Sequence, residues 1–146
     1  MKAIKLILLL VSGLILFTAC PYPRYFFTVC NNSDRDVWII SQSSIVPHPD
    51  TAIYRDAEDI AFFSKGICQN IGYNRLKGED TLHYFIFDAD TINAYSWNEI
   101  KEGYKILRRY DLSGNDIELL KESITYPPSP KMRDMKMYPP YSSEGE

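Results

Sequence analysis

The amino-acid sequence predicts an α+β domain that is mainly antiparallel β, with five or six strands and two short helices, after a cleaved export signal. Short segments rich in β-branched and aromatic residues alternate with turn-forming residues, which is typical of strands. Two other segments begin with a helix-capping serine, and the strand–helix–strand repeat of a parallel sheet is absent from the sequence. The chain divides into a signal peptide at 1–19, a tether at 20–23, a β-rich globular domain at 24–126 and a flexible tail rich in Pro, Met and Tyr at 127–146.

The first twenty residues resemble the export signal of a bacterial lipoprotein. A basic start is followed by an apolar run that ends at Ala19, and this run is shorter than the ~20 residues that a membrane-spanning helix needs. Ordinary signal peptidase is the closer rival, but it prefers a small residue where Phe17 stands. The segment Phe17-Thr18-Ala19-Cys20 resembles a lipobox, so we expect cleavage before Cys20 and lipidation of its sulfur. Residues 20–23 then form the lipid-anchor tether.

The expected location is the cell envelope, at the outer membrane and facing the periplasm. Pro21 stands at the second mature position, where an aspartate would favour retention at the inner membrane. The chain has 146 residues and a formal net charge of −3, so it is the size of one domain and lacks the basic footprint that nucleic acid requires. The expected partners are the membrane, through the lipid, and an envelope protein or glycan.

The first half of the domain predicts three strands and one ambiguous segment. Residues 24–30 and 36–41 predict two strands, and the turn residues between them favour a hairpin. Residues 56–66 fit a helix or a short strand, and we favour the strand. Residues 81–87 are apolar on both faces, which predicts a strand in the centre of the sheet.

The second half predicts the two helices and two more strands. Ser96 and Glu99 form a capping-box pattern for a helix that continues to Glu102, and Ser113 caps a helix over 114–121. Residues 104–110 and 123–126 predict strands, and residues 88–91 predict a turn.

Two cysteines remain after Cys20 is assigned to the lipid. An even remainder in an oxidising compartment favours a disulfide between Cys30 and Cys68. Two separate buried thiols explain the same pair, because sequence does not give their distance. Both interpretations stay open at this point.

The sequence predicts a protein that is not an enzyme and that has no cofactor. The chain has two histidines, His48 and His83, and neither stands in a zinc-binding spacing or a nucleophile motif. We therefore expect a non-catalytic interaction or accessory module at the cell envelope.

Two alternative functions come from local residue patterns. Tyr95, Trp97 and Tyr104 can form an exposed aromatic face that binds a glycan or a peptide, although aromatic residues also fill ordinary cores. Three methionines in the tail can bind Cu(I) through their thioether sulfurs, or they are incidental residues of a solvated tail; they are Met132, Met135 and Met137.

Short motifs that extend over most of residues 25–128 resemble those of a known group of proteins. They are Asn32-Ser33, Pro49-Asp50-Thr51, Asp80 before the 82–87 segment, Trp97-x-x-Ile100, Leu107-x-Arg109-Tyr110-x-Leu112-Ser113 and Ile124-x-Tyr126-Pro127. Together they are similar to small envelope lipoproteins of Bacteroidota-type bacteria. The resemblance implies the compartment and the type of domain, and it implies no catalytic activity.

Overall fold

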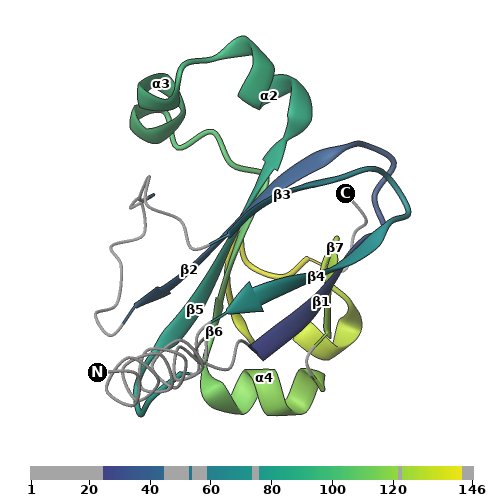
Figure 1. Ribbon diagram of the computed structural model, residues 1–146, viewed down its shortest axis with the longest axis vertical. Coiled ribbons are helices and arrows are strands. Elements are labelled where there is room, and N and C mark those ends of the chain that lie inside the picture. Colours follow the sequence, from purple (N-terminus) through teal and green to yellow (C-terminus); the bar gives the residue numbers. More distant parts are fainter. Residues whose placement is uncertain (1–24, 45–52, 54–58, 74–75, 122, 143–146) are drawn as a thin grey trace, which may run out of the picture.

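The structure is a computed structural model that describes residues 25–44, 53, 59–73, 76–121 and 123–142. The described residues form two β-sheets that enclose a hydrophobic core, together with three short α-helices and a 3₁₀ turn (Figure 1). The α+β, mainly β fold class is confirmed, with eight strands instead of five or six. The strands are β1 Tyr25–Asn31, β2 Val37–Ser44, β3 Asp59–Phe63, β4 Cys68–Tyr73, β5 Thr81–Asp88, β6 Arg108–Leu112, β7 Ser123–Tyr126 and β8 Lys136–Tyr138.

The smaller sheet has the strand order β4-β1-β7 and contains one parallel pair. Strand β1 is antiparallel to β4 and parallel to β7. Cys30 and Cys68 lie opposite each other in the β1–β4 register and are joined by a disulfide. The structure thus contains the bridge that was one of the two interpretations of this pair. Strand β4 was missed in the sequence, because Gln69, Asn70 and Gly72 dilute its apolar pattern.

The predicted hairpin of β1 and β2 is wrong, because the two strands belong to different sheets. Each strand buries alternate apolar residues in the core between the sheets, including Phe27 on β1 and Ile39 on β2. The turn between them is held by Asn31, whose side-chain amide donates to the carbonyl oxygens of Arg35 and Phe63. With this turn the chain passes from one sheet to the other and does not return along the sheet that contains β1.

The larger sheet has the strand order β3-β2-β5-β6-β8, and its neighbouring strands are antiparallel. Strand β5 is the third of five strands and is buried on both faces from Leu82 to Phe87, so its predicted central position is confirmed. Residues 59–63 form a strand, as we favoured. The predicted strand at 104–110 begins later, at Arg108, because residues 104–107 return from the helical segment.

The three helices begin at side-chain caps. Helix α3 (Trp97–Glu102) and helix α4 (Gly114–Leu120) each have a capping box, started by Ser96 and Ser113. The box at Ser96 and the serine cap at Ser113 were predicted, and Asp116 completes the second box. Residues 88–91 are not an isolated turn. Asp88 caps helix α2 (Ala89–Ala94) by accepting from the backbone N–H of Asp90, and the turn residues form its first turn.

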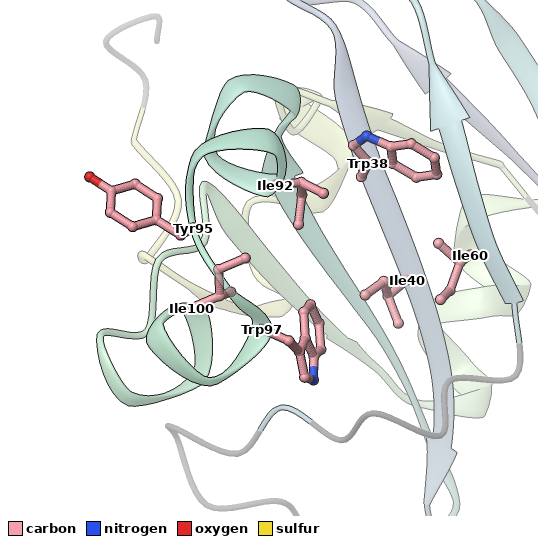
Figure 2. A pocket seen from close by; sticks show the side chains of 7 residues that line it. All are labelled: Trp38, Ile40, Ile60, Ile92, Tyr95, Trp97 and Ile100. Carbon is pink, nitrogen blue, oxygen red and sulfur yellow. The ribbon is translucent and has the colours of Figure 1, made fainter.

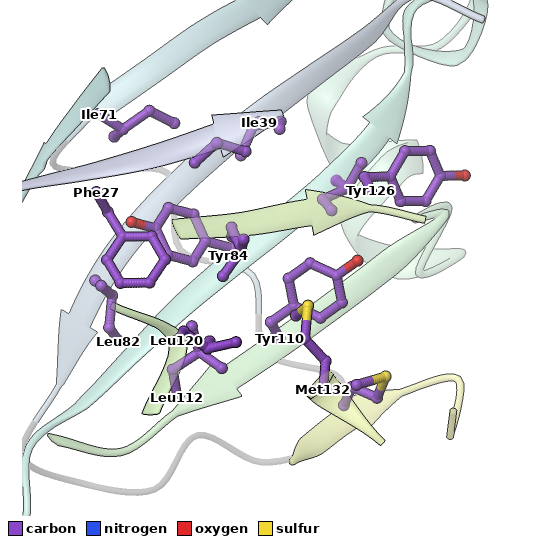
Figure 3. Packing of buried hydrophobic residues seen from close by; sticks show 14 of the residues in the cluster. Phe27, Ile39, Ile71, Leu82, Tyr84, Tyr110, Leu112, Leu120, Tyr126 and Met132 are labelled. Carbon is purple, nitrogen blue, oxygen red and sulfur yellow. The ribbon is translucent and has the colours of Figure 1, made fainter. Parts of the chain in front are cut away.

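Residues 127–142 are part of the fold, which corrects the predicted flexible tail over this range; the tail's last four residues, 143–146, lie outside the described residues. Residues 127–142 contain the 3₁₀ turn η1 (Pro130–Met132) and strand β8, which pairs with β6. The methionines that suggested a copper site are buried in the main core; they are Met132, Met135 and Met137. Figure 3 shows Met132 packed there. Unbranched methionine side chains fill irregular gaps in a core. This explains why a segment rich in prolines and charged residues contributes methionines to the core.

Candidate functional site

The outer face of the larger sheet carries a second hydrophobic cluster. Alternation along β2 directs Val37 and Ile39 into the main core, and Trp38 and Ile40 to the outer face. Helices α2 and α3 lie over part of this face and contribute apolar side chains, of which Ile100 is fully buried. The second cluster as described includes no residue of the edge strand β3, and a pocket lies between the cluster and that strand.

This outer pocket has a volume of about 360 Å³ and a mostly apolar lining (Figure 2). Strands β2 and β3 supply one side, and α2, α3 and Tyr95 from the link between them supply the other. The lining residues are Trp38, Ile40, Ile60, Ile92, Tyr95, Trp97 and Ile100. Its volume lies within the range of small-molecule and side-chain binding sites.

Aromatic contacts support the walls of the outer pocket. The Trp38 ring lies 5.3 Å from the Phe62 ring, and the Trp97 ring lies 5.8 Å from the Phe87 ring. On the edge strand β3, Ile60 is 57% exposed and Phe62 is 41% exposed. The pocket is therefore open at the β3 side, where large apolar side chains face solvent.

A second, polar concavity lies beside Phe62. We call it the acidic recess; it is lined by Asp34, Arg35, Asp36, Phe62, Lys65, Asp88, Ala89, Asp90 and Asn93. Arg35 is held there by Asp34 at 3.6 Å and Asp88 at 3.4 Å. The recess thus places four carboxylate side chains and two basic ones at the end of the apolar surface.

A buried polar network lies on the same outer face, farther along β5 and β6. Asp111 Oδ1 lies 2.6 Å from His83 Nδ1 and 2.9 Å from Arg109 Nε, and Arg109 donates through Nη1 to the Tyr104 hydroxyl at 2.8 Å. Burial alone raises the pKa of Asp111. The hydrogen bonds from His83 and Arg109, together with the positive charge of Arg109, outweigh burial and hold the pKa of Asp111 below its usual value.

The polar network is placed to stabilise the sheet. The His83 and Asp111 side chains are each 3% exposed, so neither presents a reactive group to a dissolved substrate. The sequence placed His83 in no zinc-binding or nucleophile motif, and Arg109 and Asp111 were missed as its partners. Their spacing of two residues within one strand was the available signal, because it places both on one face.

The predicted aromatic face is only partly assembled. Tyr95 and Trp97 line the outer pocket, whereas Tyr104 bonds Arg109 and packs against the Tyr138 ring at 5.3 Å. The other five lining residues were not predicted. Trp38, Ile40 and Ile60 come from strands that are distant in sequence. Ile92 and Ile100 lie within three residues of Tyr95 or Trp97, but they have no aromatic ring. Cys20 and His48 lie outside the described residues.

Among the described residues, no group of three or more His, Cys, Asp or Glu side chains is arranged to hold a metal ion. No helix in the described part of the chain has the length and hydropathy to cross a membrane. No family model, no curated protein and no solved structure matches this chain.

Proposed function

We propose that this chain is a lipid-anchored lipoprotein that acts as a non-catalytic interaction module at the cell envelope, with the outer pocket as its binding site. The observation that carries this proposal is the outer pocket itself, a preformed apolar concavity with three aromatic side chains. Ligand-binding sites in proteins are typically concave and mostly apolar, and this pocket has both properties.

The chemistry of the lining favours an apolar side chain of a partner protein, rather than a sugar ring, as the ligand. Sugar hydroxyls need several hydrogen-bond partners beside an aromatic platform. Four of the seven lining residues are isoleucines, which offer none. The peptide form of the aromatic-face alternative is therefore better supported than the glycan form.

The position of the outer pocket suits a partner away from the bilayer. Strand β1 begins at the end of the domain where α4 lies, whereas α2 and α3 lie at the opposite end (Figure 1). Only four residues, 21–24, separate Cys20 with its lipidated sulfur from β1, and this stretch spans about 15 Å when extended. The anchored end then stays near the membrane, and the pocket end projects from it.

The first prediction concerns the anchor. Changing Cys20 to serine is expected to abolish incorporation of a radiolabelled fatty acid and to release the chain from the membrane fraction, because the acylated sulfur is lost. Labelled palmitate followed by membrane fractionation measures both effects. The matched control is Cys68→Ser, which is expected to keep the label. Label retained by the Cys20→Ser chain would exclude this anchor.

The second prediction concerns occupancy of the outer pocket. Both tryptophans of the chain, Trp38 and Trp97, line it, so intrinsic fluorescence reports directly on binding. A neutral heptapeptide with leucine at alternating positions is expected to shift the emission to shorter wavelength in a saturable manner, since bound leucines displace water from the indoles. The full-length chain in vesicles of zwitterionic lipid is the sample.

The variant Ile60→Glu places a charge at the pocket wall and keeps both reporters. It is expected to weaken the peptide about tenfold or more, because a carboxylate opposes burial of an apolar group. Leu119→Glu is the matched control, since Leu119 is an exposed residue of α4, 71% accessible. A peptide that shifts no fluorescence, or that binds Ile60→Glu equally well, would exclude the pocket as the binding site.

A further inference from the structure

The outer pocket and the acidic recess meet at one pair of aromatic rings. Trp38 lines the pocket, Phe62 lines the recess, and their ring centroids lie 5.3 Å apart. The β2–β3 register places these two residues directly opposite each other. A ligand that fills the pocket and extends over this ring pair therefore reaches the recess.

The acidic recess carries an excess of negative charge. Four carboxylate side chains face two basic side chains in its lining. Arg35 is shared by ion pairs with Asp34 and Asp88, so its charge is already compensated. A carboxylate excess beside an apolar pocket favours a ligand with a cationic group next to its apolar group.

The other end of the outer pocket has no such excess of negative charge. Lys105 Nζ lies 4.2 Å from the centre of the Tyr95 ring. Figure 2 shows Tyr95 on the side of the pocket away from Trp38 and Ile60. The carboxylate of Glu99 lies near Lys105 and interacts with its charge, so the charge at the Tyr95 end is compensated. The uncompensated carboxylates of the recess therefore attract a ligand cation to the Phe62 end.

We infer that the outer pocket and the acidic recess together bind a peptide segment of a partner protein in which an apolar side chain stands close to lysine or arginine. The apolar side chain fills the pocket, and the basic side chain lies over the recess. This inference rests on the proposed function and specifies its ligand. A free fatty acid fits less well, because its carboxylate would meet the carboxylates of the recess.

Charge-matched peptides test this inference. Three heptapeptides share alternating leucines and differ only in their last two residues, which are lysine, glutamine or glutamate. At low ionic strength the lysine peptide is expected to bind about five- to tenfold more tightly than the glutamate peptide, read from tryptophan fluorescence of the full-length chain in zwitterionic vesicles. At about 1 M salt the preference is expected to disappear, because the Debye length is then ~3 Å and charges farther apart are screened.

A double variant, Asp34→Asn with Asp90→Asn, removes two carboxylates from the acidic recess. It is expected to reduce the preference for lysine to about twofold or less and to leave the affinity for the glutamine peptide unchanged. Glu79→Gln with Glu118→Gln removes the same charge from exposed sites outside the recess and is expected to keep the preference.

The outcomes separate this inference from the proposed function. Equal binding of the lysine and glutamate peptides, with the glutamine peptide still bound, would overturn the charge preference and leave the pocket as a binding site. Tighter binding of laurate than of any of the three peptides would assign the pocket to an acyl chain and overturn the inference. Failure of all three peptides to bind would exclude both proposals.

Discussion

Replacing Asp111 with alanine is expected to lower the free energy of unfolding by about 3–5 kcal/mol, since it leaves the buried groups of His83 and Arg109 without their anion. Chemical denaturation of the purified chain measures the change. Asp111→Asn is expected to be nearly as destabilising, because it keeps the shape of the side chain and removes the charge. Asp134→Ala, a change at an exposed aspartate, is the control and is expected to have an effect within about 0.5 kcal/mol.

The same prediction has a pH dependence with a definite sign. The pKa of Asp111 is lower in the folded chain than its ordinary value, since His83 and Arg109 favour the carboxylate. Its contribution to stability is therefore complete above about pH 5 and is lost as the pH falls through the folded-state value. The stability difference between the parent chain and Asp111→Ala should shrink on acidification. A difference that stays constant to pH 2 would contradict the role given to the carboxylate.

Local patterns were sufficient to predict the elements whose causes are local. The capping boxes at Ser96 and Ser113 involve side chains three residues apart, and the structure has both. The long apolar run of β5 also identified the central strand. A strand buried on both faces needs apolar residues at every position, and this pattern can be seen within the segment itself. Such features depend little on the rest of the chain.

The pairing of strands depends on contacts between distant residues, and there the sequence was insufficient. Strand β1 pairs with β4 and with β7, which begins at Ser123, although β2 is its neighbour in sequence. The outer pocket was predicted only in part from the sequence, for the same reason. Tyr95 and Trp97 are neighbours on one short helical segment, whereas Trp38 and Ile60 reach the pocket from two strands.

A chain that ends after Pro128 is expected to lose the cooperative fold. The deletion removes strand β8 and three core side chains, among them Met132, which is completely buried. It also removes the Pro139 carbonyl oxygen, which accepts from Arg108 Nη1 at 2.7 Å. Loss of each buried methionine costs about 2–5 kcal/mol, so three of them approach the whole stability of a typical domain, about 5–15 kcal/mol.

Thermal unfolding followed by circular dichroism measures this effect. The single variant Met132→Ala provides a graded comparison and is expected to lower stability by about 2–5 kcal/mol without loss of cooperativity. A chain that ends after Ser142 keeps β8 and η1 and is expected to unfold like the parent. If the chain ending after Pro128 unfolded at the parent temperature, the C-terminal segment would be a dispensable tail, and the three methionines would again be available to a soft metal such as Cu(I).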